Sequence, residues 1–281
     1  MSERPDEFDE IRQERDPVRR GQRATRLLTL YQQRATELAR LRKAAIEEAH
    51  QERGMTYTEI ASAIGLTKGR VTQIRQTGPR PEREFFGVGP VSVGIPYRYA
   101  TTDRERPLIA AEDAETGEQI EKLLAALGFA VTRYQIEPGQ ADPPPGDTVV
   151  VCGPKSADVG AALLASDPVM GMGEYDGRWW IEDRQDGHRF GSPSDDDPPQ
   201  SADLAYLARR KDGDRVVVHI AGLHVMGSLG AAHYLTGNVA AILSSTGDAS
   251  FSMVIRAAYD GRAIITSDII SGPFSWVTKC K

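Results

Sequence analysis

This chain of 281 residues has only two cysteines and no long apolar run. Cys152 and Cys280 stand far apart and lack the spacing of metal ligands, so neither a disulfide framework nor a cysteine-based metal site is expected. No stretch of about 18 apolar residues could span a bilayer, and the first residues contain no apolar signal core. We therefore expect a cytoplasmic protein that has no membrane anchor.

A net positive charge is also missing, because the whole chain carries a formal net charge of -6 at pH 7. Residues 11–80 nevertheless contain fifteen lysines and arginines against seven acidic residues, a local excess of about +8. A basic segment inside an acidic chain indicates a local contact with nucleic acid. The acidic remainder argues against a second surface that binds DNA.

Composition divides the chain into four parts. Residues 1–15 are acidic and poor in apolar side chains, so we expect a disordered tail. Residues 16–78 are expected to form a helical DNA-binding domain, and the prolines and glycines that follow suggest a linker over 79–90. Residues 91–281 are numerous enough for a second globular unit with its own core, which we expect to bind a ligand.

The segment 17–53 has no proline after Pro17, and Gly21 is its only glycine. Its apolar residues predict a long amphipathic helix, or two helices joined near Gly21. That helix can complete the core of the helical domain or pair with the same helix of a second chain. Both alternatives stay open, so a homodimer remains one of the partners considered.

Residues 56–76 describe two short helices that meet at a tight corner. Thr56 followed three residues later by Glu59 predicts a capping box at the start of the first helix. Gly65 stands where a helix ends in a left-handed conformation, and Thr67 can cap the second helix. The residues at the spacing of a buried helix face are Ile60, Ala61, Ile64, Val71 and Ile74.

Residues 59–74 resemble the helix-turn-helix of the sigma-70 region 4 type, seen also in many small bacterial regulators. The motif that carries this resemblance is E-I-A-x-x-I-G-L-T-x-G-R-V-x-Q-I. The resemblance covers about twenty residues and implies contact with double-stranded DNA, but not promoter melting. A hairpin used only for packing is the alternative. The donors exposed on the second helix suit phosphates and base edges in a major groove. The expected DNA contacts are Thr67, Lys68, Arg70, Thr72, Gln73, Arg75 and Gln76.

From residue 91 onward the pattern changes to strands and shorter helices. The expected strands include 91–95, 107–111, 129–136 and 148–152, and the expected helices include 114–127 and 158–165. Two further strands, 251–258 and 263–270, flank Asp260-Gly261 and predict a C-terminal β-hairpin. These pieces resemble the Rossmann-like ligand-binding modules that bacteria attach to helix-turn-helix domains. The expected fold class is α + α/β, with a helical domain followed by a Rossmann-like α/β sandwich.

Two loops in this second part run from a buried strand through a glycine turn into a helix. A helix amino terminus with a cation and a hydroxyl nearby favours an anion. If the two strands run parallel in one sheet, both loops lie at its carboxyl edge, where open α/β sheets bind ligands. We expect a nucleotide or another phosphorylated small molecule there. The expected ligand contacts are Gly153, Lys155, Ser156, Gly222, His224, Gly227 and Ser228.

Neither loop matches a known phosphate-binding fingerprint in its glycine spacing, so these glycines could instead serve turns and packing. Met226 replaces the first glycine of a nucleophile elbow at Ser228, which argues against a serine hydrolase. His219, His224 and His233 fall on a strand, a loop and a helix and share no face. We therefore assign no metal, no cofactor other than the nucleotide-like ligand, and no catalytic residue.

The sequence thus favours a DNA-binding transcriptional regulator whose C-terminal domain senses a small molecule. A nucleotide-processing enzyme, such as a hydrolase or an enzyme that cleaves a glycosidic bond, is the alternative, localised by its helix-turn-helix. Such an enzyme needs a general acid or base, for which His224, Asp195 and Glu174 are the candidates. A protein that binds polymerase through the same motif is a third reading.

Overall fold

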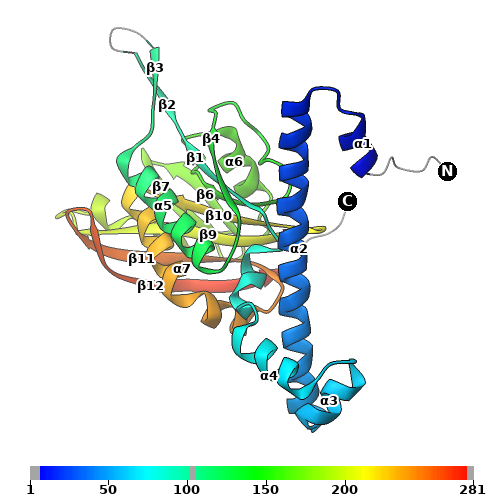
Figure 1. Cartoon of the computed structure of the whole chain (residues 1–281). Coiled ribbons are helices and arrows are strands. Elements are labelled where there is room, and N and C mark those ends of the chain that lie inside the picture. The colour runs from blue at the N-terminus through cyan, green and yellow to red at the C-terminus, as the bar shows by residue number, and fades with distance from the viewer. Residues whose placement is uncertain (1–6, 102–104, 277–281) are drawn as a thin grey trace. The chain divides into compact units, whose positions relative to one another are not determined.

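The computed structural model describes residues 7–101 and 105–276 and divides the chain into two compact units, Met1–Arg80 and Pro81–Lys281 (Figure 1). The division falls inside the segment 79–90 for which a linker is expected. Among the described residues, no helix combines the length and the apolar character that crossing a bilayer requires. Each unit is described by itself below.

The first unit is helical. Its elements are α1 (Glu7–Gln13), α2 (Pro17–Gln51), α3 (Tyr57–Ala63) and α4 (Lys68–Thr77). Asp16 caps the long helix α2, because its carboxylate accepts a hydrogen bond from the Val18 amide at 2.9 Å. The single helix α2 passes through Gly21 without a break, which decides between the one-helix and two-helix alternatives.

Helix α1 lies in the segment for which a disordered tail is expected, so that expectation is wrong for Glu7–Gln13. The ring of Phe8 stacks on Tyr31 of α2, with centroids 6.0 Å apart. The Tyr31 hydroxyl donates to the Glu7 carboxylate at 3.1 Å. A helix this short depends on packing rather than on propensity, and these contacts supply the packing. Residues 1–6 lie outside the described residues.

The corner between α3 and α4 forms as its sequence predicts. Thr56 and Glu59 make the reciprocal capping box, with the Thr56 amide donating to Glu59 at 2.8 Å. Gly65 adopts a φ of +68°, and Thr67 accepts a hydrogen bond from the Arg70 amide at 3.2 Å. The buried core of the unit consists of Ile46, Ile60, Ala61, Val71 and Ile74.

Ile64 departs from this expectation, since its side chain is 45% exposed. The residue is the C-cap of α3, where the chain turns toward Gly65 and leaves the face that packs on α2. Leu66, after the turn, packs against the core in its place.

The second unit is built on a mixed sheet of seven strands in the order β12-β11-β9-β10-β5-β1-β4. Four neighbouring strands run parallel: β10 (Arg215–Gly222), β5 (Asp147–Val151), β1 (Val91–Pro96) and β4 (Val131–Ile136). Three strands extend the sheet by antiparallel pairing: β9 (Ala202–Asp212), β11 (Ser250–Asp260) and β12 (Ala263–Trp276). The helical unit followed by this sheet and its helices gives the coarse α + α/β class.

Helices cover both faces of the sheet. The helices are α5 (Ala111–Ala126), α6 (Asp158–Ala165) and α7 (Val225–Thr246), with short 3-10 turns η1 (Pro81–Phe86) and η2 (Pro193–Asp195). Alternate residues of β9 point to opposite layers. Ala205 and Leu207 face α5, α7 and η1, whereas Leu204 and Tyr206 face α6 and a small sheet. Figure 1 shows α5 and α7 side by side over one face.

Two small sheets complete the unit. One is the hairpin β2 (Arg98–Thr101) and β3 (Glu105–Leu108), which projects from the body in Figure 1. The other contains β6 (Met170–Tyr175), β7 (Arg178–Asp183) and β8 (Arg189–Gly191).

In the second unit, the structure agrees with the expected elements named above except at residues 107–111 and 81–86. The C-terminal hairpin is confirmed, since Asp260 pairs with Ala263 across the turn. The strand expected at 107–111 is instead β3, which pairs only with β2 and not with the large sheet. Residues 81–86 of the expected linker form η1, because Phe85 and Phe86 are fully buried in the core of the second unit.

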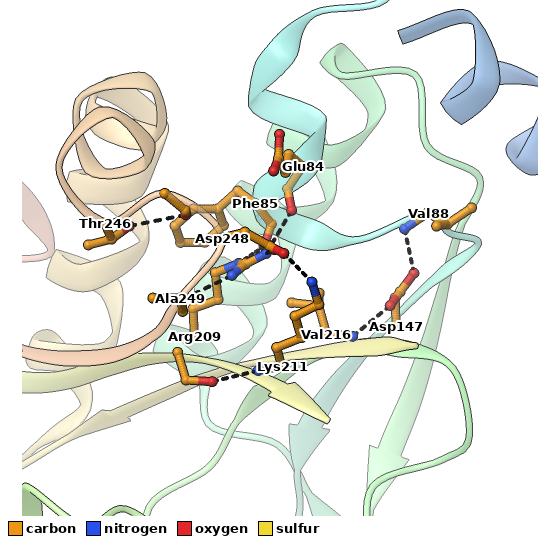
Figure 2. Close-up of polar contacts among 12 residues, drawn as sticks. Glu84, Phe85, Val88, Asp147, Arg209, Lys211, Val216, Thr246, Asp248 and Ala249 are labelled. Carbon is orange, nitrogen blue, oxygen red and sulfur yellow. Dashed lines mark hydrogen bonds and ion pairs between the residues drawn. The ribbon is translucent and has the colours of Figure 1, made fainter. Parts of the chain in front are cut away.

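A buried arginine fixes η1 to the sheet (Figure 2). The Arg209 side chain is 1% exposed, and its guanidinium donates to the carbonyl oxygens of Phe85 at 2.9 Å and of Glu84 at 3.0 Å. It also donates to the Ala249 carbonyl and to the Asp248 carboxylate, each at 3.0 Å. Arg209 thereby joins β9, η1 and the loop after α7.

A buried carboxylate binds the backbone of the segment between η1 and β1. Asp147, the first residue of β5, accepts hydrogen bonds from the amides of Val88, Gly89 and Val216, at 2.8, 2.7 and 2.8 Å. Burial raises the pKa of Asp147, while these three bonds oppose the rise. Figure 2 shows that Asp147 lies between the chain entering β1 and the start of β10. The amino ends of three parallel strands are thus held together by one side chain.

We expect the substitution Arg209→Met to lower the free energy of unfolding of the second unit by about 3 kcal/mol, because buried carbonyl oxygens lose their donor. The matched control is Lys211→Met on the same strand, whose side chain is 46% exposed and also pairs with Asp248. This control should cost less than about 1 kcal/mol. All three tryptophans lie in the second unit, so urea unfolding followed by their fluorescence measures both changes. Equal, small losses would contradict the anchoring role of Arg209.

Candidate functional site

A cavity of about 370 Å³ opens at the carboxyl edge of the parallel strands. Pro96, Val151 and Gly222 are the last residues of β1, β5 and β10, and all three line the cavity. Parallel pairing brings the loops after β5 and β10 to this edge, as the sequence predicts. Six of the seven expected ligand contacts line the cavity: Gly153, Lys155, Ser156, Gly222, His224 and Ser228.

Gly227 is the seventh residue, and the structure places it away from the cavity lining. A Cβ atom at Gly227 would lie 2.2 Å from the carbonyl oxygen of Leu204. The glycine therefore allows α7 to approach β9, which is the packing alternative considered for these glycines. Gly222 is equally constrained, because a Cβ there would lie 2.1 Å from the His224 carbonyl oxygen.

The amino terminus of α7 is already occupied by a carboxylate of the protein. Asp203 is fully buried and accepts hydrogen bonds from the Gly227 amide at 2.6 Å and the His224 amide at 3.2 Å. The Ser192 hydroxyl donates to its other oxygen at 2.6 Å. A carboxylate at this position complements the helix dipole, so Asp203 meets part of the positive end of α7. Positive side chains add to any attraction for an anion in the cavity.

Two cations lie at the cavity. Lys155 is exposed at the mouth, where its Nζ donates to the Leu223 carbonyl at 2.7 Å and lies 5.3 Å from the Trp179 ring. Partial desolvation lowers the pKa of Lys155, and Arg98 lowers it further, whereas nearby carboxylates oppose the shift. Arg98, from the segment after β1, donates to the Ser156 hydroxyl at 3.4 Å. Arg98 is a cavity residue that the sequence did not single out.

His224 is paired with Asp195, as its Nε2 lies 2.9 Å from a carboxylate oxygen of Asp195. Asp195 belongs to η2, and Arg178 lies 3.9 Å from its second oxygen. The fold thus joins two of the residues suggested as an acid or a base, although 29 positions separate them. The Ser228 hydroxyl accepts a hydrogen bond from the Gly222 amide at 3.0 Å, and among the described residues it makes no hydrogen bond with His224 or Asp195.

Asp113 is the cavity residue with the most unusual environment. It lies in the first turn of α5 and is only 8% exposed. Burial raises the pKa of Asp113 to about 6, with Arg98 opposing the rise and Glu112 adding to it. Sequence reasoning missed Asp113, although its place after the first parallel strand is a signal. A helix that follows β1 must begin at the same edge as the two glycine loops.

Three other residues considered in the sequence, two histidines and a cysteine, make contacts within the fold. His219 is buried, and its Nε2 donates to the Cys152 carbonyl at 2.7 Å. Burial lowers the pKa of His219 to about 4, which makes it a neutral core residue. The Nδ1 of His233 in α7 lies 2.7 Å from the Ser267 hydroxyl of β12. Burial raises the pKa of Cys152 to about 12, so it is a thiol, and Cys280 lies outside the described residues.

The helix-turn-helix presents a polar face on α4. Lys68, Arg70 and Gln73 are exposed, and Arg70 donates to the Gln73 side-chain oxygen at 2.7 Å. Thr72 and Gln76 are exposed as well, although the Thr72 hydroxyl donates to the Lys68 carbonyl at 3.1 Å. These side chains belong to one helix whose opposite face carries Val71 and Ile74.

Arg75 is different from the other expected DNA contacts, since its side chain is used inside the unit. Its Nε donates to Glu47 of α2 at 2.7 Å, and its guanidinium lies 3.8 Å from the centre of the Tyr57 ring. Glu47 holds the pKa of Arg75 above its ordinary value, and Arg75 lowers that of Glu47. Arg75 therefore joins α4 to α2 and α3, and its guanidinium is engaged inside the unit.

Comparison of the chain with models of protein families, with curated proteins and with solved structures finds no match. The functional interpretation consequently rests on the geometry of α4 and of the cavity.

Asp113 should make stability depend on pH in a defined direction. Its pKa is about 6 in the folded chain against 3.8 ordinarily, so unfolding releases a proton between these values. The free energy of unfolding should thus fall by about 1 to 3 kcal/mol between pH 4 and pH 7 relative to Asp113→Asn. Urea unfolding at both pH values measures the difference, with Glu118→Gln on the exposed face of α5 as control. Parallel pH dependence in Asp113→Asn and the wild type would exclude this ionisation.

Proposed function

We propose that the protein is a DNA-binding transcriptional regulator whose second unit senses a nucleotide-like or otherwise phosphorylated small molecule. The observation that carries the proposal is the exposed face of α4, where lysine, arginine and glutamine donors follow a tightly capped corner. In helix-turn-helix proteins the second helix lies in the major groove, and residues near its amino terminus contact base edges. The exposed donors of α4 begin at that end of the helix.

The donors of α4 suit different parts of a duplex. Arg70 and Gln73 are matched to guanine and adenine edges, which accept bidentate hydrogen bonds from these side chains. Lys68 and the Thr67 region, at the amino end, suit phosphate oxygens. Thr72 and Gln76 extend the same face. Because the chain as a whole has a net charge of -6, the electrostatic attraction for DNA is confined to the basic first unit.

The second unit contributes a site for the signal. Its cavity of about 370 Å³ falls within the range of small-molecule sites, which is roughly 300 to 1,000 Å³. Arg98 and Lys155 favour an anionic group, and a phosphate is the common anion at this edge of a Rossmann-like sheet. We place such a regulator in the cytoplasm, where its DNA and its ligand occur.

We further propose that the regulator is a homodimer formed through α2. Leu28, Tyr31, Ala35 and Leu38 follow one another at spacings of three, four and three residues along one stripe of this helix. Leu28 is 59% exposed and Leu38 is 67% exposed. A two-fold dimer presents two α4 helices to two half-sites, which is how helix-turn-helix proteins gain affinity and specificity.

One observation favours the alternative of a nucleotide-processing enzyme. The His224–Asp195 pair and Asp113 place ionisable groups at one cavity, as acid–base catalysis requires. The two functions differ in the fate of the ligand. An enzyme converts a nucleotide into a product that chromatography detects, whereas a sensor returns the nucleotide intact.

We expect Arg70→Ala and Gln73→Ala each to weaken binding to a selected duplex by about 1 to 3 kcal/mol and to relax the choice of base. Lys68→Ala should weaken binding to all duplexes equally and reduce the salt dependence by about one counterion. Fluorescence anisotropy with labelled duplexes across a salt series measures both effects. Arg26→Ala, an exposed arginine of α2 outside the helix-turn-helix, is the matched control. Unchanged affinity and base preference in both α4 variants would remove this helix as the reader of DNA.

The dimer is tested by Leu38→Glu, which introduces a charge into the stripe on α2. Sedimentation velocity should show a dimer for the wild type at micromolar concentration and a monomer for this variant, with helical content unchanged. Gln32→Glu introduces the same charge at an exposed position of the same helix and should leave the dimer intact. A monomeric wild type would reject the dimer.

A further inference from the structure

The cavity at the carboxyl edge is lined by two cations and by a carboxylate. Arg98 and Lys155 supply positive charge, and the Ser156 hydroxyl lies 3.4 Å from the Arg98 guanidinium. Asp113 enters the same cavity from the first turn of α5. Val151, at the end of β5, and Leu223, just after β10, add apolar surface to the same lining. A ligand that fills this space meets donors, an acceptor and apolar surface.

Asp113 is a buried residue of the cavity lining and not a charge on the protein surface. The residue is more than nine-tenths buried. Over the described ranges 7–101 and 105–276, no group donates a hydrogen bond to it, and its only charged neighbours of note are Arg98 and Glu112. Its carboxylate keeps some access to the cavity, so a ligand bound there can supply the missing donor. Of the other buried carboxylates of this unit, Asp147, Asp167 and Asp203 each accept several hydrogen bonds, and Asp183 accepts one from the Gln185 amide.

We infer that the cavity binds a phosphorylated sugar, of which a ribonucleotide is the representative, with its anion at Arg98 and Lys155 and its sugar hydroxyls donating to Asp113. A free sugar hydroxyl is a neutral donor that fits beside an apolar wall, and the phosphate gives the ligand the charge that the two cations favour. This inference rests on the small-molecule part of the proposed function. It does not depend on DNA binding by α4.

The test is isothermal titration calorimetry on the full chain. The probes are the four ribonucleoside 5′-monophosphates, their 2′,3′-dideoxy counterparts and inorganic phosphate. We expect at least one ribonucleotide to bind tenfold or more tightly than its dideoxy counterpart, since only the ribose form can donate to Asp113. Inorganic phosphate should bind more weakly than either.

Variants test whether Asp113 causes the preference for the ribose form over the dideoxy form. Asp113→Ala should bring the ribose and dideoxy forms to the same affinity, while the dideoxy form keeps its wild-type affinity within twofold. Asp113→Asn keeps a neutral acceptor oxygen and should retain an intermediate preference, which also covers the case in which the alanine variant fails to fold. Lys155→Gln should weaken both forms by the same factor. Glu118→Ala, exposed on the same helix α5, should change neither.

Equal affinity of the ribose and dideoxy forms in the wild type would overturn the inference. Binding of inorganic phosphate as tight as that of every nucleotide, or no binding of any probe to folded protein, would overturn it as well. DNA binding measured on the same preparations separates this failure from that of the regulator. Intact DNA binding with a lost ribose preference rejects only the role of Asp113, whereas lost DNA binding with an intact preference rejects only the role of α4.

Discussion

The parallel pairing of β5 with β1 on one side and β10 on the other is the constraint on which the second unit depends. Strands that run parallel must end at the same edge, so the segments after Pro96, Val151 and Gly222 meet there regardless of their distance in sequence. Asp147 holds the opposite ends of these strands together through three backbone amides. Arg209 ties the entry to β1 onto the antiparallel half of the sheet. These contacts hold the amino edge of the sheet, and the cavity lies at the carboxyl edge of the same strands.

Some charged groups at the carboxyl edge are paired within the fold, and others face the cavity. Asp203 meets the exposed amides of α7, so the glycine-rich loop after β10 serves packing and positions His224. The positive charge of the cavity comes instead from Lys155 and Arg98, and its unpaired acceptor is Asp113. The phosphorylated sugar that we propose offers an anion for the two cations and hydroxyl donors for Asp113, whereas an inorganic anion offers only the first.

Local features of the chain could be predicted from the sequence, because neighbouring residues determine them. The capping box at Thr56, the turn at Gly65 and the hairpin at Asp260 each need only residues a few positions apart. The two loops that join a buried strand to a helix through glycine could also be predicted, since strand, glycine and helix follow one another directly. Partners remote in sequence could not be found in this way.

Arg75 shows the limit most clearly. Its place among the donors of α4 suggests DNA, but Glu47, 28 positions earlier, takes its guanidinium. Asp203 and Asp113 are similar cases, because the helix or loop that each carboxylate faces is set by strand order. Strand order depends on which β-strands exclude water together, and no local spacing encodes that choice. Phe8 and Phe85 likewise convert an expected tail and linker into packed elements.

The central claim, that α4 reads a base sequence, is tested most directly by selecting duplexes from a random pool with the full chain at two salt concentrations. The retained DNA is sequenced for the wild type and for Arg70→Ala. We expect the wild type to enrich one defined motif at both salt concentrations and the variant to lose part of that motif. Retention that falls steeply with salt and enriches no motif would contradict sequence-specific reading, because phosphate contacts alone behave in that way.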